Sequence, residues 1–180
     1  MGLLKEILYR IRGEYTTEKL ITMGLTVGDN FTRMKGSILD PSHCWLIEIG
    51  DNVTMAPNVH VLCHDASTKL ILGYTKIGRV NIGNNVFIGA GTIILPGVDI
   101  GDNVIVGANS TVTHSIESGI VVAGNPAKMI CTTQKYIDKE KNRMSHTEVY
   151  GKEYTISGGI TYEKKIYQKE KLKGKVGYVI

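Results

Sequence analysis

The sequence contains few large aromatic residues, few cysteines and no long apolar run. Its 180 residues include one Trp, two Phe and three Cys, and charged residues make up 21%. Cys44, Cys63 and Cys131 are too widely spaced for a zinc motif or a disulfide framework, which predicts reduced thiols and a cytoplasmic protein. No apolar stretch is long enough to span a membrane, so we expect no integral membrane contact. Charges interrupt the apolar stretch at the N-terminus, unlike the apolar core of a signal peptide.

The excess of basic residues lies in the C-terminal segment. The formal net charge is +4, and residues 135–180 hold 11 of the 21 Lys and Arg. These lysines alternate loosely with Glu and Tyr, whereas nucleic-acid-binding modules combine a basic stripe with stacking aromatics. We therefore expect a solvated basic surface and no nucleic-acid partner.

The sequence is rich in Gly, with 21 residues, and it repeats with a period of six. This period fits neither an α-helix nor a single strand. It fits coils of three short strands, 18 residues long, that stack as parallel strands about 4.8 Å apart. The first residue of each hexad is expected to point inward, a small fifth residue to fill the corner, and Gly and Asn to form turns with positive φ. The inward positions are Ile82, Ile88, Ile94, Ile100, Val106 and Val112, and the corner positions are Val86, Thr92, Val98, Val104, Ser110 and Ile116.

The repeat predicts an all-β parallel β-helix over residues 21–131. Its phase is lost between Val61 and Ile82, where residues 66–79 fit the hexad poorly. We expect an extruded loop there, and loops on a rigid scaffold commonly determine binding specificity.

Two further segments flank the predicted β-helix. Residues 1–20 include an expected amphipathic helix over 2–12, which would pack against the β-helix. Residues 132–180 are expected to form a short polar helix over 132–142 and then an extended tail.

Five segments resemble the hexapeptide-repeat acyltransferases, especially the sugar O-acetyltransferases of capsule and lipopolysaccharide synthesis, which are related to maltose and galactoside acetyltransferases. They are residues 49–59, which include Ala-Pro-Asn-Val, and residues 63–65 (Cys-His-Asp), 82–90, 94–98 and 122–128. The resemblance implies a left-handed β-helix and a homotrimer. It also implies acetyl-CoA as co-substrate, no metal, and transfer to the hydroxyl of a sugar or polysaccharide precursor.

In that family a His that follows an Ala-Pro-Asn-Val strand is the general base, and the resemblance gives this role to His64. Strand alternation supports the assignment, because His64 points outward if Val59 and Val61 point inward. An imidazole suits the role, since an alcohol needs a base that titrates near neutral pH. His60 and His43 remain alternative bases.

Several residues near His64 are candidates for the acceptor site. Asp40, Ser42 and His43 lie about one coil before it, so stacking would bring them close to the base. We predict that they bind the acceptor together with Asp65, although Asp40 and Ser42 also suit a turn. Asp65 either orients the imidazole or is a turn residue. Cys63 would face away from His64, which argues against a Cys–His nucleophilic pair.

The resemblance also assigns residues to coenzyme A. Ala90, Ala108 and Thr113 match small residues whose backbone contacts the pantetheine arm, in a groove between neighbouring β-helices. Lys128 matches a basic residue near the phosphates.

Two other classes of function remain open. One is a zinc enzyme of the β-helical carbonic anhydrase type, with His43, His60 and His64 as neutral imidazole ligands. The other is a non-catalytic β-helix that serves as an assembly scaffold, since fold alone does not determine function.

Overall fold

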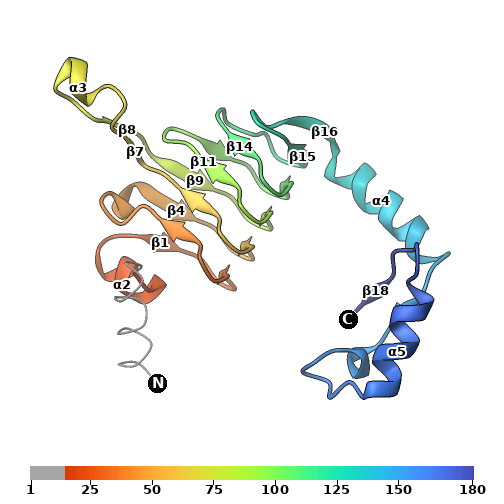
Figure 1. Ribbon diagram of the computed structural model, residues 1–180. Coiled ribbons are helices and arrows are strands. Elements are labelled where there is room, and N and C mark those ends of the chain that lie inside the picture. The colour runs from red at the N-terminus through yellow and green to blue at the C-terminus, as the bar shows by residue number, and fades with distance from the viewer. Residues whose placement is uncertain (1–14) are drawn as a thin grey trace. The chain divides into compact units, whose positions relative to one another are not determined.

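A computed structural model describes residues 15–180, and the chain divides into two compact units, residues 1–133 and 134–180. The first unit is a parallel β-helix whose short strands stack into three sheets (Figure 1). Sheet A consists of β1 (Thr26–Val27), β4 (Ile47–Ile49), β9 (Val80–Ile82) and β12 (Asp99–Ile100). Sheet B consists of β2 (Thr32–Arg33), β5 (Thr54–Met55), β10 (Phe87–Ile88), β13 (Ile105–Val106), β15 (Ile120–Ala123) and β16 (Lys128–Thr132). Sheet C consists of β3 (Ile38–Leu39), β6 (His60–Val61), β11 (Ile93–Ile94) and β14 (Thr111–Val112).

The inward positions of the hexads form the core. All six aliphatic residues predicted to face inward, from Ile82 to Val112, are at most 3% exposed. Five of the six corner residues, from Val86 to Ser110, are at most 2% exposed. The buried hydroxyls of Thr92 and Ser110 both donate to the carbonyl oxygen of Gly107, so neither is left unsatisfied. The period of six is thus confirmed as the pattern that fills the interior.

One corner of the β-helix carries a column of asparagines. Asn30, Asn52, Asn85 and Asn103 all have a φ of 55–56°, a left-handed conformation that Asn tolerates better than most residues. Their side-chain amides bond from coil to coil at 2.9, 3.1 and 3.3 Å. The predicted positive φ at Gly-Asn corners is confirmed, and the column also ties each coil to the next.

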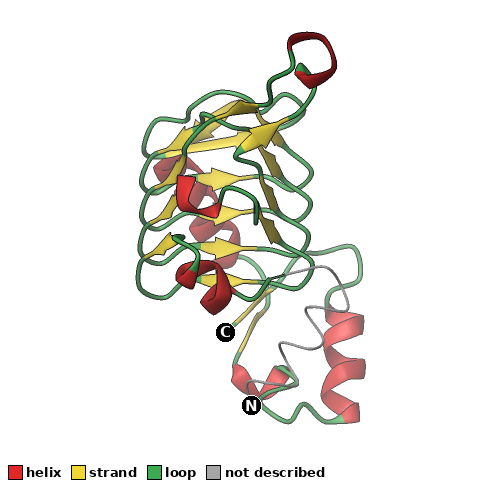
Figure 2. Cartoon of the chain, turned by 90° about the vertical axis from the view of Figure 1, so that its left-hand side faces the viewer, coloured by secondary structure: helices red, strands yellow, loops and turns green. Residues whose placement is uncertain are grey.

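Two successive coils are extended at one corner, where the chain passes from sheet C to sheet A. The first extension contains a short 3₁₀ helix, η1 (Cys44–Leu46). The second contains β7 (His64–Asp65), which pairs antiparallel with β8 (Lys76–Ile77), and α3 (Lys69–Leu72) at its tip. Figures 1 and 2 show α3 projecting away from the stacked coils. The segment 66–79 therefore leaves the repeat without disturbing the phase of the strands on either side.

At its start the described chain forms α2 (Thr17–Thr22), where the Thr16 hydroxyl accepts a hydrogen bond from Lys19 N as an N-cap. Leu20 of this helix is fully buried in the core. The helix expected over 2–12 lies outside the described residues.

The second unit differs from the extended tail expected from the sequence. The last residue of the first unit begins α4 (Thr133–Met144), close to the helix expected over 132–142. Beyond it come β17 (Val149–Tyr150), η2 (Lys152–Tyr154), α5 (Tyr162–Lys171) and β18 (Tyr178–Val179), with β17 and β18 paired in parallel. The expectation of an extended tail was wrong, because Thr161 caps α5 by accepting from Lys164 N and the following ten residues form a helix.

A pair of substitutions tests which residues face inward. Ile88→Ala is expected to lower the free energy of unfolding by about 2–5 kcal/mol, because it leaves a cavity in a closely packed core. Phe87→Ala is the matched control, since Phe87 is the adjacent residue and is 45% exposed. Its loss should be much smaller. Urea unfolding at one protein concentration measures both, and equal losses would contradict the inward and outward assignment.

Candidate active site

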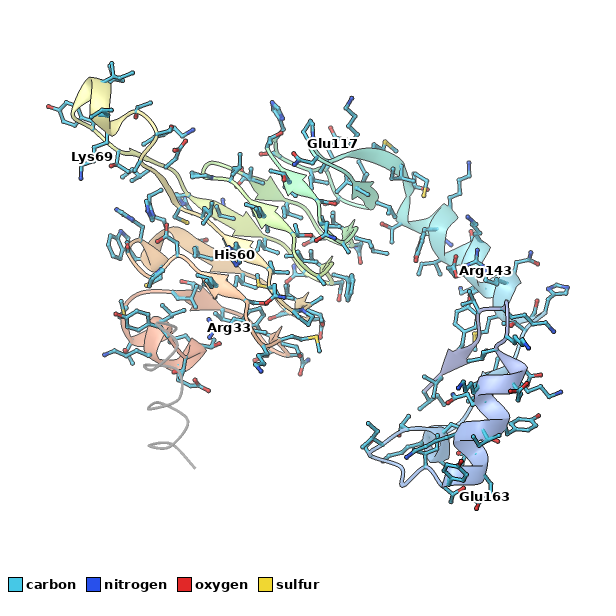
Figure 3. The ribbon with its side chains drawn as sticks, viewed as in Figure 1. Arg33, His60, Lys69, Glu117, Arg143 and Glu163 are labelled. Atoms are coloured by element: carbon cyan, nitrogen blue, oxygen red, sulfur yellow. The ribbon has the colours of Figure 1, made fainter. Side chains whose placement is uncertain are left out.

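Strand alternation after β6 places His64 at the surface of the β-helix. Val59, Val61 and Cys63 are all fully buried, whereas His60 is only partly buried and the His64 side chain is 37% exposed. In Figure 3 the label of His60 marks this part of the β-helix and that of Lys69 marks the projecting segment. The predicted alternation is confirmed, and it leaves the imidazole of His64 accessible from outside.

The carboxylate of Asp40 holds the imidazole of His64. Leu39 of β3 pairs with Val61 of β6, which brings Asp40 beside the residues that follow β6. Its Oδ2 lies 2.5 Å from His64 Nδ1 and also accepts from Cys63 N at 2.9 Å. Its Oδ1 accepts from Ser42 N at 3.0 Å. Asp40 is 1% exposed, so hydrogen bonds to its neighbours replace contact with water.

These contacts keep Asp40 ionised. Burial alone would raise the pKa of its carboxyl group, but the hydrogen bonds from His64, Cys63 N and Ser42 N outweigh burial and lower the pKa. An ionised carboxylate can only accept, so the proton between the two groups belongs to His64 Nδ1. The neutral imidazole then has an unprotonated Nε2, which is the form that accepts a proton.

The prediction that Asp40 binds the acceptor needs correction. Both of its oxygens are engaged and it has almost no exposed surface, so it positions His64 instead of meeting a ligand. The sequence had suggested Asp65 as a possible partner of the imidazole. Asp65 instead accepts from Ser67 N at 2.9 Å and pairs with Lys76 Nζ at 3.2 Å, and these contacts hold its pKa at about 2. Asp65 therefore stabilises the start of the projecting segment.

His43 lies next to His64 on the extended corner. The centroids of the two rings are 5.4 Å apart. A nitrogen of each imidazole and a carboxylate oxygen of Asp40 all lie within 4.8 Å of one another, a grouping that is also geometrically compatible with a metal ion. The buried Nδ1 of His43 has no hydrogen-bond partner within residues 15–180.

Cys63 is not a nucleophile in this site. Its side chain is fully buried on the opposite face of the strand from His64. Burial, with a smaller contribution from the nearby charge of Asp40, raises the pKa of its thiol to about 12. The expectation that Cys63 faces away from His64 is confirmed.

Three of the residues matched to coenzyme A lie at the two ends of the sheet C strands, and the fourth, Lys128, lies in sheet B. Ala90 and Ala108 occupy equivalent corners one coil apart, where Asn109 N donates to Ala90 O at 2.8 Å. Thr113 follows β14, at the opposite ends of the sheet C strands. The chain also continues from β6 toward His64 at these ends of the strands. Lys128 begins β16 and is exposed. Of these four residues, only Thr113 therefore lies at the same end of the sheet C strands as His64 within one chain.

Comparisons with known proteins agree with this architecture. A family model for bacterial transferase hexapeptide repeats (six repeats) matches residues 79–114. Protein CapG of Staphylococcus aureus is 38% identical over 175 residues, which cover 94% of this chain and 96% of CapG. A solved maltose O-acetyltransferase from Clostridium difficile 630 is 44% identical, with a TM-score of 0.54 over 61% of this chain and 59% of that chain. The chain belongs to the hexapeptide-repeat acetyltransferases.

Within these acetyltransferases, a solved galactoside acetyltransferase in complex with coenzyme A is 26% identical to this chain. The two match with a TM-score of 0.55 over 74% of this chain and 80% of that one. The chain spans nearly the whole length of CapG but a little under two thirds of the maltose O-acetyltransferase. The protein is an enzyme of the acyl-transfer class, and the scaffold alternative is set aside.

The carbonic anhydrase alternative is not supported. Among the described residues, the group whose ligand atoms converge contains His43, His64 and Asp40, and His60 is not part of it. The three histidines of that alternative therefore do not converge, and the relatives are acetyltransferases. Within residues 15–180, no helix is long and apolar enough to cross a membrane.

The contacts of Asp40 predict a specific dependence of stability on pH. Asp40→Asn is expected to lower the free energy of unfolding near neutral pH by about 2 kcal/mol, because an amide cannot accept from all three donors. The folded pKa lies below the ordinary value of 3.8, so the carboxylate stabilises the fold fully above that value. This stabilisation is lost as the pH falls through the folded pKa.

The stability difference between the parent and Asp40→Asn should therefore shrink in acid, as measured by urea unfolding at a series of pH values. Asp29→Asn is the control, because Asp29 is an exposed carboxylate in the same unit. It should change stability little at any pH. A difference for Asp40→Asn that grows as the pH falls would contradict the assignment.

Proposed function

We propose that this acetyltransferase transfers the acetyl group of acetyl-CoA to a hydroxyl of a sugar or polysaccharide precursor. Two similar proteins are named for saccharides, the maltose O-acetyltransferase and the galactoside acetyltransferase, and the structure of the latter contains coenzyme A. Direct transfer fits the site, since no cysteine is available as an acyl carrier beside His64: Cys63 is buried and its thiol has a raised pKa.

The pairing of His64 with Asp40 is the observation that carries this proposal. A buried carboxylate at 2.5 Å fixes the tautomer and the orientation of an imidazole that is otherwise 37% exposed. This is the arrangement by which a carboxylate prepares a histidine to accept a proton from a hydroxyl. Neither His60 nor His43 has a carboxylate partner among the described residues, so His64 is the base that the geometry favours.

His64 Nε2 takes the proton of the acceptor hydroxyl as that oxygen attacks the thioester carbonyl carbon. A carbon–oxygen bond forms and the carbon–sulfur bond breaks. The imidazolium then gives the proton to the departing sulfur, which leaves as the thiol. Asp40 stabilises the imidazolium between the two proton transfers because its negative charge lies against Nδ1.

The positions of the residues matched to coenzyme A favour a binding site between two copies of the chain. The small residues Ala90, which is partly buried, and Ala108, which is exposed, lie at one end of the sheet C strands, and the exposed Lys128 offers a charge for phosphates. His64 follows β6, at the opposite ends of the sheet C strands. We propose that left-handed β-helices assemble as a homotrimer, so that the base of one copy and the small residues of the next border one cleft.

Replacement of His64 tests the base. His64→Ala is expected to lower kcat for acetyl transfer by about 10²–10⁴-fold while coenzyme A binding stays within about threefold. Asp40→Asn should lower kcat by less, because the imidazole remains but loses its fixed tautomer. A thiol-release assay with acetyl-CoA and maltose or methyl galactoside measures kcat, and calorimetry measures binding.

His60→Ala is the matched control, since His60 is a partly buried imidazole in the same sheet. It should retain kcat within about threefold. Turnover of His64→Ala close to that of the parent, or a collapse in His60→Ala alone, would remove His64 from the role of base.

The projecting segment 66–79 provides a separate argument for assembly. Leu70, Ile71 and Leu72 are 96%, 85% and 62% exposed, an unusual run of apolar residues for an isolated surface. We expect light scattering to report three copies of the 19.7 kDa chain at micromolar concentration. A fully active monomer would contradict the shared cleft.

We also expect the segment 66–79 to affect acceptor choice more than coenzyme A affinity.

A further inference from the structure

Trp45 is an exposed aromatic residue within two ring contacts of the proposed base. The centroids of Trp45 and His43 are 5.3 Å apart, and those of His43 and His64 are 5.4 Å apart. Trp45 itself is 54% exposed. The indole Nε1–H makes no hydrogen bond to any residue of the described chain 15–180, and a free indole donor next to a reaction centre is available to a ligand.

The backbone that carries Trp45 is rigid. Trp45 lies in η1, and the preceding residue, Cys44, is fully buried with its thiol 3.7 Å from the carbonyl oxygens of Leu20 and Met23. On the other side the chain approaches so closely that a Cβ on Gly24 would lie 2.8 Å from Trp45 Cβ. The indole is therefore presented from a fixed support, which reduces the entropy lost when a ligand binds.

We infer that Trp45 is the platform on which the pyranose ring of a saccharide acceptor stacks, with His43 between it and His64. This inference rests on the proposed function and names the residue that would recognise its acceptor class. One face of a pyranose presents C–H groups, which pack against the electron-rich face of an indole. A sugar hydroxyl at the ring edge can then hydrogen-bond with His43 Nε2, while another hydroxyl reaches His64.

The fluorescence of the parent protein tests the inference without any substitution. Trp45 is the sole tryptophan of the chain, so indole emission reports on this residue alone. Titration with maltose and with methyl galactoside is expected to give a saturable blue shift, whereas glycerol, a polyol without a ring, should give none at equal concentration. No saturable change with either saccharide overturns the inference. Emission that is already blue and protected from acrylamide before any addition also overturns it, because another copy of the chain would then cover the indole.

Kinetics of two variants give the second test. Trp45→Ala is expected to raise KM for the saccharide about tenfold or more, with kcat and KM for acetyl-CoA within about threefold of the parent. Trp45→Phe keeps an aromatic face and should lie between the two. Phe87→Ala removes an exposed aromatic from sheet B and should leave all three constants unchanged. An unchanged saccharide KM in Trp45→Ala overturns the inference.

The two proposals fail in different ways. If the parent transfers no acetyl group to any saccharide but its emission still saturates, the proposed reaction is wrong and the saccharide platform stands. If the parent acetylates maltose or the galactoside but Trp45→Ala does so with unchanged KM, the reaction stands and the platform is wrong.

Discussion

The stacking of successive coils in register is the constraint on which the rest of the structure depends. Strands of two or three residues are too short to be stable alone, so their backbone groups need partners on the coils above and below. The aliphatic residue at the start of each hexad fills a narrow interior, and a shift by one residue would turn that residue outward. The column of asparagines fixes the same register from outside. Packing and polar contacts therefore select one alignment of the coils.

The chemistry follows from that alignment. Asp40 and His64 are 24 residues apart, and they meet because Leu39 pairs with Val61 across two coils. The carboxylate is buried at the edge of the core, where its hydrogen bonds to backbone amides are strong and water does not compete. The imidazole lies on the outer side of the same edge. A scaffold of short strands thus holds the carboxylate and the imidazole in a fixed position at the edge of its core.

The sequence predicts the regular part of this molecule better than its site. Because the period is fixed, each inward residue from Ile82 to Val112 can be predicted from the local sequence. Alternation after Val59 is enough to predict that His64 points outward. The position of Asp40 close to the base also follows from coil length. Its burial does not, because burial depends on how the residues after Pro41 leave the coil, and no repeat governs that turn. The helix α5 was missed for a similar reason, since it lies outside the repeat and its capping residue is a single Thr.

The two extensions of the regular coil both occur at the corner between sheets C and A, and each leaves the strands that flank it in phase. Residues can therefore be added or removed at this corner without changing the register of the core strands. The scaffold separates two evolutionary demands, because hexads are constrained by stacking while the corner can vary in length and in the residues outside the site. Divergence among relatives in acceptor choice would accumulate there first, and sequence comparison confined to the hexads would miss it.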